Sequence, residues 1–287
     1  LAASGVAMAD SATLQKVKDT QNINLGVRDS SGLSFTIGNG KYVGFHTEMG
    51  ENIIRDVRRQ LGLSSLTTTY VPVNSQNRIP LVTNGTVDLE CGSTTNTLAR
   101  QKDVAFANTT YLEEVRMAVK ADSNIKTFRD LKGKTVVTTT GTTSVQTLRK
   151  DKRAEGIQFK DIQGKDHADS HLLLESGRAD AFVMDTSILA SNIAKSKNPK
   201  AFKIVGEPLS VEPIACMVRK DDPEFLAAVN ASIARQVGDG TLARLYDKWF
   251  LQPIPPTNTS LNMPLSDGTK TAWAVPNNKP MEDYNAK

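Results

Sequence analysis

The sequence predicts an α/β fold built as two lobes, and two observations carry this prediction. Segments rich in β-branched and apolar residues alternate with segments of helical spacing, which is typical of a mostly parallel sheet flanked by helices. This alternation runs through residues 22–91, then starts again, and a later stretch of chain returns to the first pattern. Because a long stretch of chain separates the two parts of the first pattern, we expect a discontinuous first lobe, residues 10–112 plus 212–287. The stretch between them, residues 113–211, is expected to form a second lobe, joined to the first by two crossovers.

The first run is expected to hold three strands and two helices. Its clearest helix covers 47–61, where Met49, Ile53 and Val57 follow helical spacing and Gly62 provides a stop. Strands are expected at 22–27, 67–73 and 87–91, and a short helix at 76–83.

The second run also alternates strands with helices, and after it the chain returns to the first lobe. Strands are expected at 114–120, 135–140, 157–162 and 181–184, a helical turn at 128–133, and helices at 141–152, 166–175 and 187–194. The return is expected to form a strand at 214–219, a helix that starts at Asp222-Pro223 and reaches 237, and a helix at 241–250. The chain after Pro253 shows no period, so we expect it to wrap over the surface.

The first nine residues are expected to be the remnant of a signal peptide. Ala7-Met8-Ala9 is an A-x-A cleavage site that follows small apolar residues and precedes Asp10. An alanine-rich helix start or an expression scar is the alternative. No later stretch is long and apolar enough to span a bilayer, so we expect an exported, soluble protein of the periplasm.

Charge and composition are those of an ordinary soluble protein. The net charge is +4, with 39% hydrophobic and 23% charged residues. Nucleic-acid binding calls for a basic stripe interleaved with aromatics. The basic residues here alternate with acidic ones, and the cluster of Arg55, Arg58 and Arg59 is better interpreted as a solvated helix face. No nucleic-acid partner is expected.

The two cysteines, Cys91 and Cys216, form a candidate disulfide, because an even pair in an exported protein is often oxidised. Each lies in or beside a predicted strand. Two buried free thiols are the alternative, and spacing does not decide between them.

Polar side chains follow the predicted strands at their carboxyl ends, where ligands bind in α/β sheets. These residues are Arg28, Ser75, Ser93, Thr95, Thr143 and Asp185. Their shared position predicts a common site more strongly than any single motif does.

The residue types indicate an acidic ligand that also carries an ammonium group. Arg28, Arg78 and Arg100 each offer a planar fork of donors that fits a carboxylate. A single arginine would more simply be solvated or ion-paired, but three near strand ends favour a shared anion. Asp185 ends an apolar strand and is costly to bury alone; a ligand ammonium or a neighbouring lysine would compensate it.

Two further motifs bear on the site. Gly141-Thr142-Thr143-Ser144 opens a helix whose free N–H groups suit a carboxylate, although a plain helix cap explains it equally well. His167 and His171 lie at i, i+4, which could be half a zinc site, but no third ligand is evident. We therefore expect no metal and no cofactor, with His167 as a donor to an anion and His171 on the surface.

Catalysis has little support in the sequence, since G-x-S-x-G, H-E-x-x-H and G-x-G-x-x-G after a strand are all missing. Cys91 and His167 lack the spacing of a nucleophile and its base. The chain is expected not to be an enzyme. The alternative is an enzyme on the same scaffold, such as a dehydratase of cyclic carboxylates, with Glu90 and His167 as the candidate acid or base.

Several runs of the sequence resemble the periplasmic glutamate/aspartate-binding proteins of bacterial ABC importers. The similarity spans nearly the whole chain after residue 9 and fades in the last twenty or so residues. The runs are 26–28, 75–81, 91–96, 100–102, 165–167, 174–179, 219–223 and 247–250.

The resemblance implies a role for each site residue. Arg100 would pair with the α-carboxylate of the ligand, helped by the N–H groups of Thr95 and Thr143. Asp185, the Thr95 hydroxyl and the Ser93 carbonyl would hold the α-ammonium. The side-chain carboxylate would be surrounded by Arg28, Ser75, Arg78 and His167.

The resemblance also implies an architecture and a partner. The family has a type II fold, in which two α/β lobes close on a ligand in the cleft between them. The expected ligands are L-glutamate and L-aspartate, the expected partner is the membrane permease of an ABC importer, and the expected state is a monomer.

Overall fold

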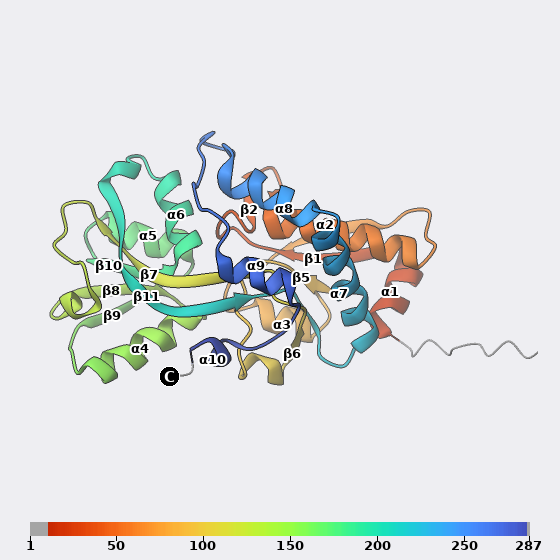
Figure 1. Ribbon diagram of the computed structural model, residues 1–287, viewed down its shortest axis with the longest axis horizontal. Coiled ribbons are helices and arrows are strands. Elements are labelled where there is room, and N and C mark those ends of the chain that lie inside the picture. The colour runs from red at the N-terminus through yellow and green to blue at the C-terminus, as the bar shows by residue number, and fades with distance from the viewer. Residues whose placement is uncertain (1–10, 286–287) are drawn as a thin grey trace, which may run out of the picture.

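The computed structural model describes residues 11–285, and the predicted signal remnant lies outside them. Two five-stranded sheets lie toward opposite ends of the molecule, each flanked by helices (Figure 1). We call the first sheet with its helices the first lobe and the second sheet with its helices the second lobe.

The first lobe lies at the right of Figure 1. Its sheet has the order β4 (Thr67–Pro72), β1 (Asn22–Val27), β5 (Leu89–Glu90), β12 (Met217–Arg219) and β6 (Val104–Phe106). Its helices are α1 (Ala12–Thr20), α2 (Phe45–Gln60), α3 (Arg78–Thr83), α7 (Pro223–Gly238) and α8 (Thr241–Tyr246), the last continued by a π-helical turn, Asp247–Leu251.

The second lobe lies at the left of Figure 1. Its sheet has the order β11 (Phe202–Ile214), β7 (Tyr111–Lys120), β10 (Ala181–Asp185), β8 (Thr135–Thr139) and β9 (Lys160–Gly164). Its helices are α4 (Thr143–Glu155), α5 (His167–Glu175) and α6 (Thr186–Lys195). Short 3-10 turns lie at Arg100–Lys102, Phe128–Leu131 and Pro199–Ala201.

Both sheets are mixed, whereas the sequence predicted mostly parallel ones. In the first sheet β1 runs parallel to β4 and β5, but β12 runs antiparallel to β5 and β6. In the second, β8 runs parallel to β9 and β10, but β7 runs antiparallel to β10 and β11. The antiparallel pairings belong to the strands that carry the chain between the lobes, because the chain crosses once in each direction.

Before residue 253, five helices and strands were not predicted: α1, the hairpin of β2 (Phe35–Gly38) and β3 (Lys41–Val43), β6, and most of β11. β11 is an edge strand interrupted by Gly206 and Pro208, and its burial does not alternate cleanly. The predicted strand 214–219 is split because Ala215 and Cys216 bond elsewhere. Ala215 donates its N–H to Thr94, and the Cys216 carbonyl accepts from Ala107.

The chain passes between the sheets at two adjacent places, residues 107–110 and 215–216. β7 and β11 continue from them side by side through the middle of the molecule (Figure 1). Each sheet has its own buried apolar clusters, with Leu25 and Phe250 in one and Val136 and Phe182 in the other. The boundaries at 112/113 and 211/212 stay a prediction.

A disulfide joins Cys91, which follows β5, to Cys216 at the second crossover, with their Cα atoms 4.4 Å apart. It therefore ties one crossover to the centre of the first sheet. The link spans 125 residues of sequence, and a loop of that length gives a large entropic stabilisation in the chain-entropy model.

The C-terminal tail is more regular than the sequence predicted. It forms α9 (Asp267–Ala274) and α10 (Met281–Tyr284), and α9 lies against the central strands in Figure 1. Trp273 donates its indole N–H to the Thr110 carbonyl at 2.8 Å and stacks near Phe45. The N-cap Ser266, which accepts from Thr269, was the local signal for α9.

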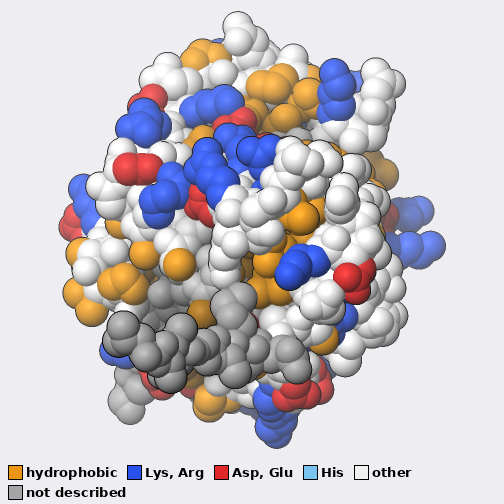
Figure 2. Space-filling view, turned by 90° about the vertical axis from the view of Figure 1, so that its right-hand side faces the viewer, with side chains coloured by type: hydrophobic (Ala, Val, Ile, Leu, Met, Phe, Trp, Pro, Cys, Tyr) orange, Lys and Arg blue, Asp and Glu red, His pale blue; other side chains and the backbone are white. Residues whose placement is uncertain are grey.

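The basic cluster of α2 belongs to the first lobe, and Figure 2 views the molecule from the side of that lobe. Lys and Arg side chains gather there with acidic ones among them. Arg55 and Arg59 are exposed, and Arg59 pairs with Asp56 at 3.3 Å. This is the solvated helix face that the sequence predicted. Within residues 11–285 there is no helix of sufficient length and apolarity to cross a membrane.

Replacing Trp273 by alanine is expected to lower the free energy of unfolding by about 1–3 kcal/mol, because the half-buried indole loses its hydrogen bond and its aromatic contacts. Denaturant unfolding measures this, with Val275→Ala as the control, since Val275 is 65% exposed on the same segment. Equal stability of the two variants would mean that the tail does not stabilise the central strands.

Candidate functional site

Seven of the nine predicted site residues line one small cavity between the lobes. They are Ser75, Arg78, Ser93, Thr95, Thr143, His167 and Asp185. Thr142, Met184 and Ile188 complete the lining. Arg28 and Arg100 do not line it, but each hydrogen-bonds a residue that does. The cavity lies at the carboxyl ends of strands from both sheets, as the sequence predicted.

Arg78 is a buried cation without an ion-pair partner. It stands at the start of α3 and is only 2% exposed. Its Nη1 donates to the Ser93 carbonyl at 3.3 Å, while its Nε has no acceptor. Burial lowers the pKa of Arg78 well below its usual range, and the charges of Arg100 and Arg28 lower it further. Among residues 11–285 no carboxylate lies within 4.0 Å of it, so this guanidinium lacks an anion.

Asp185 is the matching buried anion. It ends β10, is 4% exposed, and its carboxylate receives no hydrogen bond or ion pair from the described part of the chain. Burial raises the pKa of Asp185 well above its usual value, and Glu113 and Glu212 raise it further. A carboxylate in this state gains most from a cation that enters the cavity.

Arg28 connects the two lobes next to the cavity. Its guanidinium donates to the Ser75 hydroxyl at 3.1 Å and pairs with Asp166 of the second lobe at 3.2 Å. The arginine is fully buried, while the Asp166 side chain is 45% exposed. Burial lowers the pKa of Arg28, and Asp166 and Glu90 oppose that shift.

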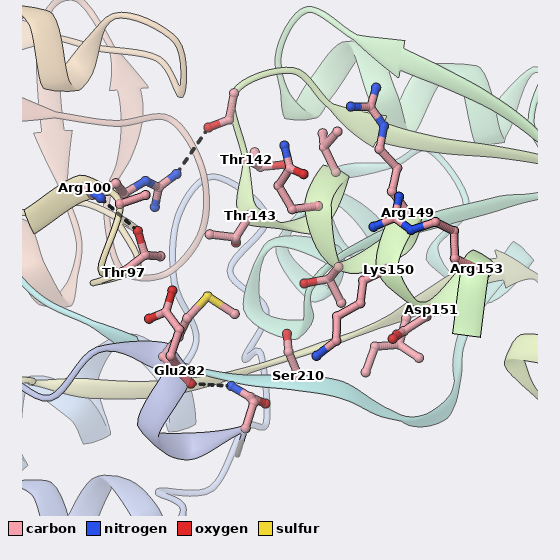
Figure 3. Close-up of a pocket in the computed structure, with 18 of the residues that line it drawn as sticks. Thr97, Arg100, Thr142, Thr143, Arg149, Lys150, Asp151, Arg153, Ser210 and Glu282 are labelled. Carbon is pink, nitrogen blue, oxygen red and sulfur yellow. Dashed lines mark hydrogen bonds between the residues drawn. The ribbon is translucent and has the colours of Figure 1, made fainter. Parts of the chain in front are cut away.

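Arg100 lies at the other end of the site, where it borders a wider outer groove (Figure 3). It donates to the Thr95 carbonyl at 2.9 Å and, across the lobes, to the Gly141 carbonyl at 3.3 Å. Gly141 has φ +80°, and a Cβ there would meet the Ser75 backbone at 2.9 Å. A glycine is therefore required for the lobes to approach this closely. Arg149, Lys150 and Arg153 of α4 line the groove as well.

His167 begins α5, where its backbone N–H is capped by Asp166. It is 1% exposed, and its Nδ1 is 3.0 Å from the Thr139 hydroxyl. Burial and the nearby Arg28 and Arg78 hold the pKa of His167 well below its usual value, so the neutral ring can offer one N–H to an anion.

His171 was predicted on the surface, and this is wrong. It is 6% exposed and its ring centroid is 4.9 Å from that of Phe202. The i, i+4 spacing turns it toward the sheet rather than away from it. Among the residues described, no group of three or more His, Cys, Asp or Glu side chains could hold a metal ion.

Three buried carboxylates surround the site. Glu90 was expected there only as a candidate acid or base of the enzyme alternative, and Glu113 and Glu212 were not predicted to belong to the site. Glu90 accepts from the Thr94 hydroxyl at 3.0 Å, and the charge of Arg78 opposes the rise in its pKa that burial causes. Glu113 accepts from the Ser187 hydroxyl, and its burial raises its pKa to about 7. Glu212 accepts from both Thr95 and Thr143. The sequence does contain a signal for Glu212, because it is the single carboxylate in the apolar run 211–216. The strand pattern alone did not show that this residue lies near the cavity.

Comparison with known proteins identifies the family. A model of the bacterial extracellular solute-binding proteins, family 3, matches residues 23–252. The chain belongs to this family. A glutamate/aspartate import solute-binding protein of Salmonella typhimurium is 43% identical over 95% of this chain and 91% of its own length. An L-glutamate/L-aspartate-binding protein of Pseudomonas aeruginosa is 43% identical over 94% and 90%.

Solved structures agree with the fold. A mutant of the arginine-binding protein of T. maritima superposes with a TM-score of 0.72 at 28% identity, covering 83% of this chain and 98% of that one. An ancestral amino-acid-binding protein, described as a precursor of cyclohexadienyl dehydratase, gives 0.71 at 28% identity, with 84% and 99% covered. The predicted fold class, two α/β lobes of the type II periplasmic-binding kind, is confirmed.

Replacing Asp185 by asparagine is expected to stabilise the ligand-stripped protein at neutral pH by on the order of 1–3 kcal/mol, the usual cost of an unsatisfied buried polar group. A raised pKa means that the folded protein binds this proton more tightly than the unfolded chain does. The wild-type protein therefore gains stability as the pH falls through that raised pKa toward the usual value of a carboxyl group, and the difference between the two proteins shrinks over this range. Thermal unfolding at several pH values measures this; a variant that is less stable at neutral pH would contradict it.

Proposed function

We propose that this protein is an extracytoplasmic solute-binding protein that captures L-glutamate and L-aspartate by closure of its lobes and delivers them to the permease of an ABC importer. The observation that carries the proposal is the pair of uncompensated buried charges, Arg78 and Asp185, that line one cavity. A zwitterion with an extra carboxylate supplies an anion to one and an ammonium to the other. The similarity to the glutamate/aspartate-binding relatives supports the same ligand.

The ligand atoms are assigned as follows. The α-carboxylate pairs with Arg100 beside the N–H groups of Thr95 and Thr143. The α-ammonium pairs with Asp185, the Thr95 hydroxyl and the Ser93 carbonyl. The side-chain carboxylate pairs with Arg78 and is surrounded by three further polar groups, those of Arg28, Ser75 and His167. The unpartnered Nε of Arg78 and the unpartnered hydroxyl of Ser93 support this assignment, because both are buried donors without acceptors.

The same charges account for the selectivity. Glutamine would turn an amide N–H₂ toward the arginine donors and leave buried polar groups unpaired, which is costly. Glutamate and aspartate differ by one methylene, worth about 1–3 kcal/mol, so both are accepted.

Lobe closure and location complete the proposal. The two bodies that move are residues 10–112 with 212–287, and residues 113–211, with the crossovers as the hinge. The closed form is what the permease recognises. The protein acts as a monomer in the periplasm.

An enzyme on this scaffold is the competing hypothesis, because one structural relative is a dehydratase precursor. It requires an acid or base that faces the ligand. Glu90 does not line the cavity, and its carboxylate accepts from the Thr94 hydroxyl. His167 is left as the single candidate of the two that were proposed. Release of product from a panel of small carboxylic acids would favour the enzyme.

Replacing Arg78 by alanine is expected to weaken L-glutamate binding at least about tenfold, because truncating one partner of a buried charge pair costs on the order of 2–5 kcal/mol. Titration calorimetry measures the affinity, and circular dichroism checks the fold. Arg59→Ala is the matched control, since Arg59 is exposed on α2 far from the cavity. Unchanged affinity in the Arg78 variant would remove the assignment of an acidic side chain.

A further inference from the structure

Glu212 holds the two lobes together from the hinge itself. It lies near the end of β11, three residues before the second crossover, and has no exposed surface. Its Oε2 accepts from the Thr95 hydroxyl of the first lobe at 2.6 Å and from the Thr143 hydroxyl of the second at 2.8 Å. Its Oε1 accepts from the Ser210 hydroxyl at 3.1 Å.

These bonds are not the ion pair that a buried glutamate usually forms. Within the described chain no lysine or arginine nitrogen lies within 4.0 Å of Glu212. Arg100, whose pKa the charge of Glu212 raises against the effect of burial, gives its hydrogen bonds to the carbonyls of Thr95 and Gly141. Burying a carboxylate is costly unless it is well hydrogen-bonded, and three hydroxyls supply that here.

The polarity of the two threonines follows from this arrangement. A hydroxyl carries one hydrogen and two lone pairs. Thr95 and Thr143 both donate their hydroxyl hydrogen to Glu212. Each hydroxyl can therefore present only lone pairs to the cavity, which both residues line. A lone pair accepts from an ammonium but repels another acceptor.

We propose that Glu212 is a positioning residue that fixes the Thr95 and Thr143 hydroxyls as acceptors and so makes the cavity require an ammonium group on its ligand. The inference rests on the proposed function and names a determinant of its specificity. The charges near Glu212 agree with it: Asp185 and Glu113 place two more carboxylates at this end of the site, and Glu212 contributes to the raised pKa of both.

Glutamine at position 212 would undo this polarity while keeping the shape of the side chain. When its amide oxygen accepts from the Ser210 hydroxyl, as Oε1 does now, its N–H₂ group stands in the place of Oε2, to which both threonine hydroxyls donate. Each threonine then meets a donor and turns its hydrogen into the cavity. The site loses an acceptor for an ammonium group and gains a donor. A ligand that lacks an ammonium group tolerates this donor.

The experiment compares L-glutamate with glutarate, which keeps both carboxylates and lacks the ammonium. Affinities are measured by calorimetry, directly or by competition, on ligand-stripped wild type, Glu212→Gln and Glu114→Gln. Glu114 is the control, because its exposed carboxylate lies on β7 beside Glu113 and contacts none of the cavity residues. In Glu212→Gln, glutamate is expected to bind at least about tenfold more weakly while glutarate binds as well as before or better. Glu114→Gln should match wild type for both.

An equal loss for glutamate and glutarate in Glu212→Gln would mean that the residue only supports the fold, and would overturn the inference. If that variant fails to fold, Thr143→Val provides the test. It removes one acceptor and one hydrogen bond to Glu212, which keeps its bonds from Thr95 and Ser210. Glutamate alone should weaken, and an equal loss for both ligands again contradicts the inference. Failure of wild type to bind glutamate would instead overturn the proposed function, so the two outcomes are distinguishable.

Discussion

The structure depends on two charges that the fold buries without compensating them. Arg78 and Asp185 come from different lobes and line the same cavity, and neither has an oppositely charged partner among the described residues. Each would be more stable in water. The closed arrangement is therefore a site prepared for a guest with both signs of charge, and the energy of closure has to come in large part from that guest.

The hinge provides the rigidity that this arrangement needs. The two crossovers run side by side, the disulfide ties one of them to the first sheet, and α9 packs against the central strands. Glu212 lies where these supports meet and bonds a hydroxyl from each lobe. The closed geometry thus depends on the hinge strands as much as on the residues that the ligand contacts.

Much of this site could be predicted from the sequence because α/β sheets place their binding residues after strand ends. Arg28, Ser75, Thr95 and Asp185 fall at such positions, and the helix that starts near Thr143 was evident from its glycine turn. Glu212 and Glu113 could not be predicted, because they lie within the crossover strands, where pairing partners come from distant parts of the chain. β11 was missed for the same reason: Gly206 and Pro208 lie where its pairing with β7 is interrupted, and the paired parts on either side are recognisable only from that distant strand.

Titration calorimetry of the refolded, ligand-stripped protein with glutamate, aspartate, glutamine and arginine tests the central claim most directly. The account predicts that glutamate and aspartate bind with roughly micromolar affinity or better, which corresponds to about −8 kcal/mol, and that glutamine and arginine bind far more weakly. Tighter binding of glutamine or arginine than of both acidic ligands would contradict it.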